Sequence, residues 1–595
     1  MIDFGLRRAQ GMDGSREGTL VGVMDETLTP MGGRFLRSAL LRPLIDPYEI
    51  RKRHEAVEYF IYDFELLEVL RTSLRKIQDL ERISSRVSSG AANARDLAAI
   101  RNSLSELPRI KTALSSTREP GLKSMAEDIP DFSLLGDLID RSIVDNPPFS
   151  IREGGIIKGK YHAEVDELRN VSTRSRDFIS AMELRERKRT GISSLKVGYN
   201  RVFGYYIEVT KTNLEMVPDD YVRKQTLVSS ERFTTPELKE YENKVLGAEE
   251  RLKNLEYDVF LQVLESVREE TARLLKTSDV LAAADFLASL AVIAKRYNYV
   301  RPAVTEEGAI EIADGRHPVL ERVLSDERFI PNSTFIDGQE SMLHVLTGPN
   351  MAGKSTYMRQ VALIVLMAQM GSFVPAASAT IGTVDRIFTR IGASDFLSMG
   401  QSTFMVEMIE AANIVHNATS KSLILLDEVG RGTSTFDGIS IAWALAEYIV
   451  NGIKARTLFA THYNELTELA LTLDGVKNYN VSVREWGDEI IFLRKIEEGP
   501  ADKSYGIQVA RLAGIPEAII ERAKEVLHNL ENEELNETGT PKLARRKTRK
   551  RKEQLDLFSS VSDSVVNEIL NLDADNLTPE EALRKIIELR EKIKF

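Results

Sequence analysis

The sequence contains no cysteine, and this absence excludes disulfide bonds and metal sites built on thiolates. It has no run of 18 or more apolar residues, which argues against a membrane-spanning helix. The N-terminal residues show neither the apolar stretch nor the cleavage pattern of a secretion signal. These three absences favour a protein of the cytoplasm without a membrane partner.

An excess of positive charge is missing as well, because the formal net charge is −11 over 595 residues. A nucleic-acid-binding protein needs only a local basic face, so this value neither supports nor excludes DNA as a ligand. The one dense basic run is RRKTRKRK at residues 545–552, for which a solvated linker is the simpler explanation. Length alone suggests about three to five domains.

Proline is absent between Pro47 and Pro108, and apolar residues recur there at helical spacing, which predicts long amphipathic helices. The run LKVGYNRVFGYYIEVTK, from residue 195, instead predicts a β-hairpin or small sheet. Thr235 and Pro236 then begin a second proline-free run, which as one helix would extend roughly 100 Å. This order is typical of a long helical lever that carries a small β domain at its tip. An ordinary helical bundle with a β-sheet insertion is the alternative.

From about residue 301, short apolar runs at 342–346, 423–426, 457–460 and 489–493 alternate with helical segments such as 357–370. This alternation predicts an α/β domain with a largely parallel sheet. Residues 530–555 are polar and predict a linker, and Thr578-Pro579 predicts the start of a helix in a small C-terminal unit.

A glycine-rich loop between a predicted strand and a predicted helix matches the pattern GxxxxGK[ST] at residues 348–355. Its backbone N–H groups would close around phosphates, Lys354 would reach the β- and γ-phosphates, and the Ser355 hydroxyl would bind Mg²⁺. We therefore predict ATP as the ligand of Gly348, Pro349, Asn350, Met351, Ala352, Gly353, Lys354, Ser355 and Thr356.

The apolar run SLILL ends in two acids, Asp427 and Glu428, about seventy residues after the glycine-rich loop. We predict that Asp427 holds Mg²⁺ and that Glu428 polarises the water that attacks the γ-phosphate. A strand that simply ends in a charged turn is the structural alternative, and the glycine-rich loop argues against it.

The segment LSMGQST at residues 397–403 resembles the LSGGQ signature of ABC-class ATPases. In that class the signature of one subunit caps the ATP held by the other, which implies a dimer. His462 follows the apolar run TLFA and resembles the switch histidine that senses the γ-phosphate, although a lone histidine is more often structural.

Four segments, GPNMAGKST, GQSTFMVEM, LLDEVGRGTSTFDG and FATHYNEL, are together similar to the ATPase motifs of the MutS mismatch-repair family, in order and spacing. The resemblance covers nearly the whole chain, from REGTLVGVMDETLTP to DKSYGIQVARLAGIP, which resembles the helix-turn-helix that buttresses the dimer. It implies that Phe329 stacks on adenine, that Ser402 reaches the partner's γ-phosphate and that Arg431 lies at the nucleotide interface. It further implies duplex DNA, a MutL-type repair protein and a homodimer, with a tetramer through the C-terminal unit as the larger assembly.

Two further sets of residues are candidates for contacts with macromolecules. The pentapeptide Gln554-Leu555-Asp556-Leu557-Phe558 resembles the peptide that docks on the replication sliding clamp, with an ordinary helix start as the alternative. The resemblance assigns DNA contact to the β-rich clamp, where the candidate phosphate contacts are Lys196, Arg201, Lys211, Arg223, Lys224 and Arg232. The alternative for each of these residues is a solvated surface charge that does not contact DNA.

The core segment begins almost at Met1, so we expect this chain to lack the connector domain of the family and its mismatch-reading domain with a Phe-x-Glu wedge. It would be either a fragment or a natural relative that recognises DNA by encirclement. The resemblance therefore implies an ATPase that grips or slides on DNA, probes no mispaired base itself and acts in the nucleoid. The alternatives are a relative that acts on recombination junctions, a transporter ATPase and a chromosome-organising ABC-type ATPase.

The predicted fold is multidomain and mainly α, with an α/β ATPase. The predicted divisions are core and lever helices at 1–190, the clamp at 191–240, the lever return at 241–300, the ATPase at 301–530, a basic linker at 531–555 and an oligomerisation unit at 556–595.

Overall fold

The computed structural model describes residues 18–200, 204–306, 308–324, 328–349, 352–391, 403–486, 489–500 and 505–531, together with residues 578, 580 and 583–588. The chain divides into two compact units, residues 1–509 and 510–595, and each is described by itself. The finer six-part division predicted from the sequence stays a prediction.

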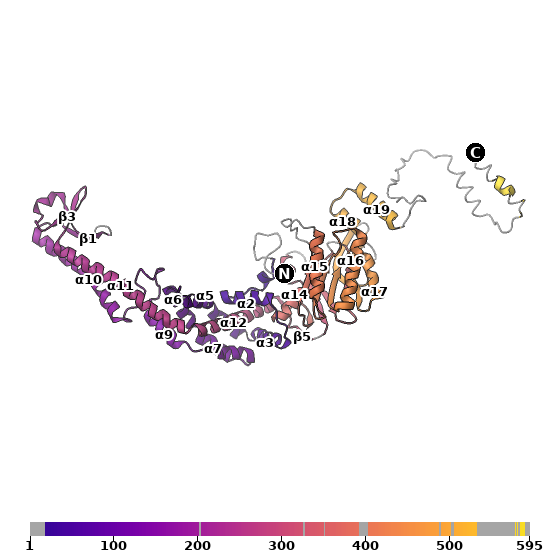
Figure 1. The fold of residues 1–595 in the computed structure, drawn as a ribbon, viewed down its shortest axis with the longest axis horizontal. Helices are drawn as coiled ribbons and strands as arrows, with labels where there is room; N and C mark the ends of the chain where they lie inside the picture. The colour runs from indigo at the N-terminus through magenta and orange to yellow at the C-terminus, as the bar shows by residue number, and fades with distance from the viewer. Residues whose placement is uncertain are drawn as a thin grey trace. The chain divides into compact units, whose positions relative to one another are not determined.

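Twelve helices among the described residues form the helical body of the first unit (Figure 1). They are α1 (Leu20–Met24), α2 (Pro30–Leu41), α3 (Pro47–Tyr62), α4 (Phe64–Leu74), α5 (Leu80–Ser88), α6 (Ala94–Leu104), α7 (Leu107–Ser115), α8 (Pro120–Glu127), α9 (Ser133–Ser142), α10 (Ala163–Thr190), α11 (Pro236–Glu269) and α12 (Thr271–Tyr297).

The helices after Pro47 are shorter than the sequence predicts. Asp63, Asp79 and Asn93 each accept a backbone hydrogen bond as the N-cap of a new helix and so divide the run. The second proline-free run is likewise two helices, because α11 ends at Glu269 and α12 begins at Thr271. Thr235 is the predicted N-cap of α11, and its hydroxyl accepts from Leu238 N at 3.1 Å.

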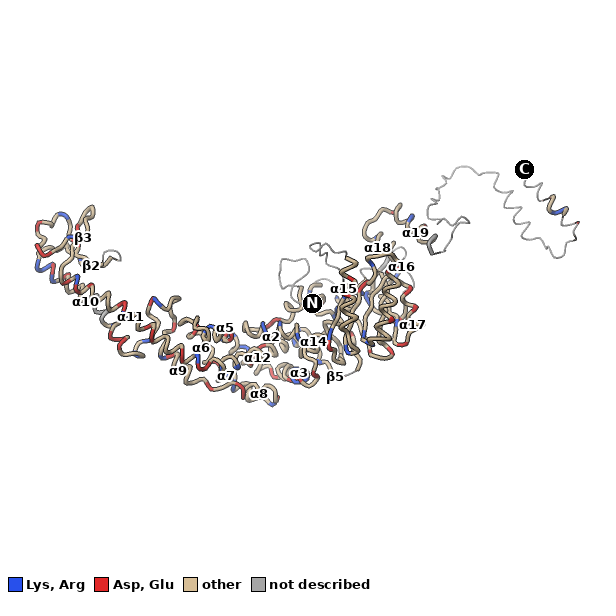
Figure 2. Tube along the Cα trace, viewed as in Figure 1, with Lys and Arg blue, Asp and Glu red and all other residues tan. Residues whose placement is uncertain are grey.

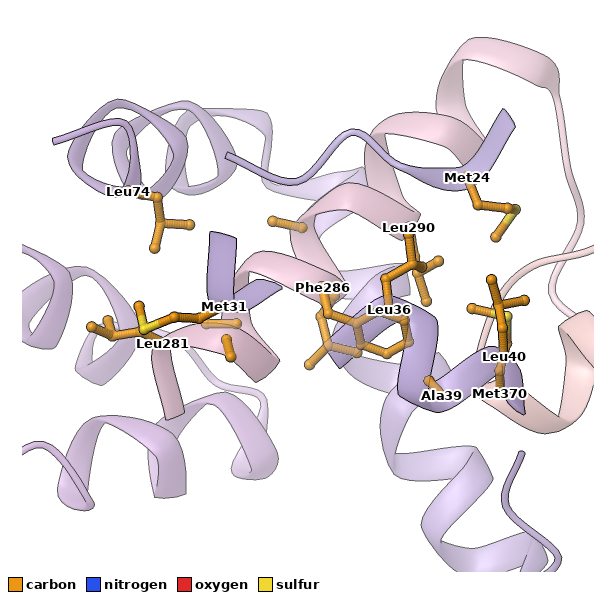
Figure 3. Packing of buried hydrophobic residues seen from close by; sticks show 14 of the residues in the cluster. Met24, Met31, Leu36, Ala39, Leu40, Leu74, Leu281, Phe286, Leu290 and Met370 are labelled. Carbon is orange, nitrogen blue, oxygen red and sulfur yellow. The ribbon is translucent and has the colours of Figure 1, made fainter. Parts of the chain in front are cut away.

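Helix α12 is largely buried inside the body and packs against α2. Figure 3 shows Leu281, Phe286 and Leu290 of α12 among the side chains of α2, with Met370 in the same cluster. Its length and apolar composition would suit a membrane span, but 78% of the relevant window is buried inside the protein. We therefore interpret α12 as the core helix of the body.

Helices α10 and α11 pack on each other and carry a four-stranded antiparallel sheet, here called the clamp (Figure 1). Its own small core includes Ile207, Val209 and Phe233 from alternate positions of two strands. The strand order is β1-β2-β4-β3. The elements are β1 (Lys196–Asn200), β2 (Gly204–Thr210), the 3₁₀ turn η1 (Lys211–Met216), β3 (Val222–Thr226) and β4 (Ser230–Thr234). A β-rich insert between helices is confirmed.

The rest of the first unit is an α/β domain with two sheets. The six-stranded sheet has the order β10-β11-β12-β8-β13-β14, parallel except for the β13–β14 hairpin. Its elements are β8 (Leu343–Thr347), α14 (Lys354–Met370), β10 (Ile387–Arg390), α15 (Thr403–Asn417), β11 (Leu423–Asp427), α16 (Thr435–Tyr448), the π turn η3 (Ile449–Ile453), β12 (Arg456–Ala460), η4 (Asn464–Glu468), α17 (Leu469–Thr472), β13 (Val476–Trp486) and β14 (Glu489–Glu498). The largely parallel sheet is confirmed.

A second, four-stranded sheet with the order β5-β9-β6-β7 lies in the same domain and was not predicted. Its strands are short, and the antiparallel β6–β7 pair alternates buried and exposed residues. Its elements are β5 (Ala303–Thr305), β6 (Ile310–Gly315), α13 (Leu320–Val323), β7 (Asn332–Ile336) and β9 (Ser378–Gly382).

Strand β11 shows why the six-stranded sheet forms. All five of its residues are buried, with Leu423 and Leu425 in the core shared with α14, and Ile424 and Leu426 in the core shared with α16. Successive side chains of a strand point to opposite faces, so a continuous apolar run suits a strand covered by helices on both sides.

The helices α18 (Gly506–Leu512) and α19 (Glu517–Glu531) follow the sheet and are joined by a turn at Ala513 and Gly514. In the second unit Arg511 bonds Glu517 at 2.5 Å across this turn. The helix–turn–helix expected from the resemblance is thus present, and residues 583–588 are helical as well.

Candidate functional site

The glycine-rich loop joins β8 to α14 at the carboxyl edge of the sheet. Gly348 and Gly353 have φ angles of 129° and 114°, a backbone region that other residues rarely adopt. Gly353 is the N-cap of α14, so the first N–H groups of a 17-residue helix face the loop. Ala352, Ser355 and Thr356 lie at this end of α14, as predicted.

Lys354 points back over this loop. Its Nζ donates to Gly348 O at 2.5 Å and to Pro349 O at 3.2 Å, and the residue is only 5% exposed. Burial lowers its pKa, whereas the carboxylates of Glu428 and Asp427 act in the opposite direction. A buried ammonium with negative groups nearby is suited to bind phosphate oxygens.

Strands β8, β11 and β12 are parallel neighbours, so their carboxyl ends meet at this loop. Asp427 ends β11, on the edge where Ser355 lies in the first turn of α14. Burial raises the pKa of Asp427, and the nearby Ser355 hydroxyl opposes this rise. The sheet therefore brings together two oxygen groups 72 positions apart that suit Mg²⁺.

Glu428 follows Asp427 with a φ angle of 54°, in the left-handed region that costs energy for a non-glycine residue. Its backbone N–H donates to Ala460 O at the end of β12, at 2.9 Å, which fixes this turn. Its carboxylate Oε2 accepts from Arg431 Nη1 at 2.6 Å. The carboxylate is 19% exposed, so it lies at the mouth of the site.

His462 lies two residues after β12 on the same edge. Its ring reaches solvent, but the surrounding protein removes enough water to lower its pKa, and the charge of Glu428 opposes that shift. The structure thus brings Lys354, Ser355, Asp427, Glu428 and His462 to one edge of the sheet. None of the described residues groups three or more His, Asp or Glu side chains as a metal cage. A cation here would need phosphate oxygens or water as further ligands.

Phe329 is half-buried and lies just before β7, a strand of the domain's second sheet. Its segment is held by Lys495 Nζ, which donates to Pro331 O at 2.9 Å, and by Asn332 Nδ2, which donates to Arg494 O at 2.9 Å. These bonds tie the predicted adenine residue to β14.

Several predicted site residues lie outside the described part of the chain. They are Asn350 and Met351 of the glycine-rich loop, Ser402 of the signature, Arg201 of the clamp, and Gln554, Leu555, Leu557 and Phe558 of the docking peptide. Their predicted roles stay predictions.

The clamp residues show two different environments. Lys196 and Lys211 are exposed, at the start of β1 and just after β2, and no ion pair involves them in the described part of the chain. Beside them, Ser194, Thr210 and Asn213 form a cluster in which Asn213 Nδ2 donates to both hydroxyls, at 3.0 and 3.1 Å. Cations and neutral donors of this kind suit a phosphate backbone.

The other three described candidates are held by acids of the clamp and lever. Arg223 lies 2.7 Å from Glu231 and Lys224 lies 3.4 Å from Glu242. Arg232 is the most enclosed, because its guanidinium bonds Glu208 at 2.9 Å and lies 4.0 Å from the ring centroid of Tyr206. Figure 2 shows acidic and basic positions interspersed along α10, α11 and the clamp.

The helical body holds the far end of α14. Leu44 N, in the loop before α3, donates to Gln369 O at 3.0 Å, and the side-chain Nε2 of Gln369 donates to Leu44 O at 2.8 Å. Arg53 Nη1 donates to Met370 O at 2.8 Å, and His54 Nε2 bonds Ala368 O at 3.1 Å. Burial lowers the pKa of His54 to about 4, so the ring is neutral. We call this contact the α14 joint.

The sequence did not single out three buried residues behind the site. Glu407, Arg390 and Tyr463 are 4%, 5% and 6% exposed. Glu407 and Tyr463 both bond Gly430, two residues after Glu428, and Arg390 bonds Glu407. The available signal was the position of Glu407 in the mainly apolar stretch TFMVEMI, where a charge needs a buried partner.

Fold and site together define a phosphate-loop ATPase built onto a helical body that carries a small β-sheet clamp. A family model described as MutS domain III matches residues 6–291, and one described as MutS domain V matches residues 344–531. The DNA mismatch repair protein MutS of Thermodesulfovibrio yellowstonii is 54% identical over 588 residues, which are 98% of this chain and 68% of that protein. The protein of the same name from Acetivibrio thermocellus is 52% identical over 98% of this chain and 67% of its own length.

The chain belongs to the MutS family and is a MutS-type DNA mismatch repair ATPase. It spans about two thirds of the length of these relatives. Membership implies ATP binding by the α/β domain and DNA binding by the protein.

Proposed function

We propose that the carboxyl edge of the six-stranded sheet hydrolyses ATP to ADP and phosphate with Mg²⁺. The observation that carries this proposal is the buried Lys354 ammonium, which is bonded within the glycine-rich loop and lies close enough to Asp427 and Glu428 for both carboxylates to raise its pKa. Ser355 and Asp427 would hold Mg²⁺ against the phosphates, and Lys354 would neutralise the β- and γ-phosphates. Glu428 would orient and polarise the attacking water, and His462 would contact the γ-phosphate.

The test is ATP turnover by the full chain with and without duplex DNA, comparing the parent with Glu428→Gln. Loss of the general base is expected to lower kcat by about a hundredfold or more. The matched control is Glu340→Gln, because Glu340 is an exposed acid in the turn before β8, at the opposite edge of the sheet. Parent-like turnover by Glu428→Gln would show that this carboxylate is not the base.

We propose a homodimer in which Ser402 and Arg431 reach the nucleotide of the partner. Exposed apolar side chains on the helices beside these residues support a covered face: Met405 and Ile409 on α15 are 53% and 47% exposed, and Phe436 on α16 is 84% exposed. A dimer also agrees with Arg431, which is 64% exposed while bonded to Glu428.

We propose that duplex DNA is held by the clamp through Lys196 and Lys211, with Arg201, Arg223, Lys224 and Arg232 as further candidates. ATP would act as a switch, because the helix that starts at the glycine-rich loop ends in the α14 joint with the helical body. A shift of α14 on nucleotide binding would thus reach the lever helices directly.

The remaining partners are proposals from the family. They are a MutL-type repair protein, the replication sliding clamp through residues 554–558, and a tetramer through the C-terminal unit, in the bacterial cytoplasm at the nucleoid. Gripping or sliding on duplex DNA is likewise a proposal for this chain.

A further inference from the structure

Behind the ATP site, the two peptide groups that flank the Gly430 Cα, here together called the Gly430 peptide, are each held by a buried side chain. The Gly430 N–H donates to Glu407 Oε1 at 2.5 Å, and the Gly430 carbonyl accepts from the Tyr463 hydroxyl at 2.9 Å. Gly430 is itself buried, so neither bond competes with bulk water.

The carboxylate of Glu407 is fixed independently of Gly430. Its second oxygen, Oε2, accepts from Arg390 Nη2 at 3.2 Å, and both side chains are almost fully buried. A buried ion pair tolerates little displacement, since separating the charges leaves each without compensation. Each oxygen of Glu407 therefore has its own partner, and the side chain is a rigid support for the Gly430 amide.

The Gly430 peptide also has no free space in which to shift. Its φ angle is 92°, and a methyl group on its Cα would lie 2.6 Å from Gly438 O. The Tyr463 hydroxyl lies against Gly438 as well. Burial raises the pKa of Tyr463, and the nearby charge of Glu407 acts in the same direction, so the phenol stays protonated and can donate.

The three residues that meet here belong to three different parts of the ATP site. Glu407 is on α15, the helix that begins directly after the signature segment, and Tyr463 directly follows His462. Gly430 lies between Glu428 and Arg431, whose side chains are bonded to each other. The Gly430 peptide thus links Glu428 and the segment of His462 in one site to α15, the helix that would face the partner's nucleotide.

We propose that Glu407 and Tyr463 are positioning residues for ATP hydrolysis. By fixing the Gly430 peptide they set where the Glu428 carboxylate and the Arg431 guanidinium lie. If α15 moves when it completes the nucleotide site of the partner, this movement thereby shifts Glu428 in the site of its own chain. This inference rests on the proposed ATPase role of Glu428.

The test is steady-state turnover of Mg·ATP by the full chain carrying Tyr463→Phe. This change removes one hydroxyl and one buried hydrogen bond, and about tenfold lower kcat is expected, with KM for ATP within about twofold of the parent. The matched control is Tyr221→Phe, because the Tyr221 phenol is similarly buried and donates to Glu186 of α10 at 3.0 Å, beside the clamp. That control should keep the parent kcat, and a parent kcat for Tyr463→Phe would overturn the proposal.

A second variant tests the other support of the peptide. Glu407→Asp keeps the negative charge for Arg390 but withdraws the carboxylate by one methylene from the Gly430 N–H. It should also lower kcat with little change in KM, and thermal unfolding should report whether each variant is folded. If either folded variant instead raises KM at unchanged kcat, the pair binds nucleotide rather than positioning the acid.

A double-variant comparison separates this inference from the proposed function. In the Glu428→Gln background, Tyr463→Phe should slow single-turnover hydrolysis by less than about twofold, because its effect passes through Glu428. A further tenfold loss there would show that Tyr463 acts on another group. If Glu428→Gln itself turns over like the parent, the proposed function fails. If it is inactive and both positioning variants match the parent, only this inference fails.

Discussion

The ATP site and the clamp use charge in opposite ways. At the ATP site, Lys354 and Asp427 are buried, come from segments far apart in the chain and point to one edge of the sheet. In the clamp, Arg223 and Arg232 lie near acids of the same small domain, and Lys196 and Lys211 face solvent. Removing one of several buried charges that meet at a site has a large effect on function, because their arrangement is fixed. Exposed charges each contribute a small, additive amount to binding.

The largest effect is expected from Lys354→Ala. Removing a buried ammonium from the phosphate loop should lower kcat/KM for ATP on the order of a thousandfold. ATP turnover over a range of concentrations measures this change, and nucleotide binding by calorimetry separates affinity from rate. Lys421→Ala, an exposed lysine in the turn before β11, is the matched control. A loss of kcat/KM of tenfold or less would show that Lys354 contributes no more than an exposed lysine of the clamp does.

Sequence alone was sufficient for the parts whose chemistry is local. The five buried residues of β11 predicted a central strand, and the spacing GxxxxGK[ST] predicted the loop whose glycines have positive φ angles. It was not sufficient for the second sheet, because strands as short as Ala303–Thr305 carry little periodic signal. The support of Gly430 by Glu407 was also invisible, since the contact joins residues 23 positions apart through tertiary packing.

The clamp shows a second limit of sequence reasoning. Arg232 and Lys196 are equivalent as basic residues of a β-rich insert, yet one lies over the Tyr206 ring and the other is exposed. Which acid lies beside a strand residue depends on register, and the sequence does not give the Glu208–Arg232 pairing of β2 and β4.

The α14 joint links the helix of the ATP site to the helical body, and its buried histidine gives an intermediate effect. The pKa of His54 is lowered to about 4, against about 6.5 in an unfolded chain, because burial disfavours the charged ring. Below pH 6.5 the unfolded state therefore binds a proton that the folded state does not. Stability is fully present above pH 6.5 and is lost as the pH falls towards 4, by about 2 kcal/mol between pH 7 and pH 5.

Urea unfolding of the parent and of His54→Gln at pH 7 and pH 5 measures this contribution. Glutamine keeps a donor for Ala368 O but does not titrate, so the variant should lose less stability on acidification. The buried His317 and His344 are present in both proteins and cancel in the comparison. His416→Gln, at an exposed histidine of α15, is the control. Equal losses for parent and His54→Gln would mean that the joint opens before the histidine is protonated.

The smallest effect is expected at the clamp, from Lys196→Ala with Lys211→Ala. If each lysine neutralises one phosphate, the slope of log affinity for duplex DNA against log salt should fall by about 0.9 per lysine, with a loss on the order of tenfold near 0.1 M salt. Arg232→Gln is the informative comparison, because its guanidinium is already engaged by Glu208 and Tyr206. It should leave the slope unchanged while lowering the stability of the clamp by about 1 kcal/mol. If Arg232→Gln reduces the slope as much as a lysine substitution does, the ion pair between Arg232 and Glu208 opens when DNA binds. The paired charges of the clamp would then describe the DNA-free protein and would not be needed for its fold.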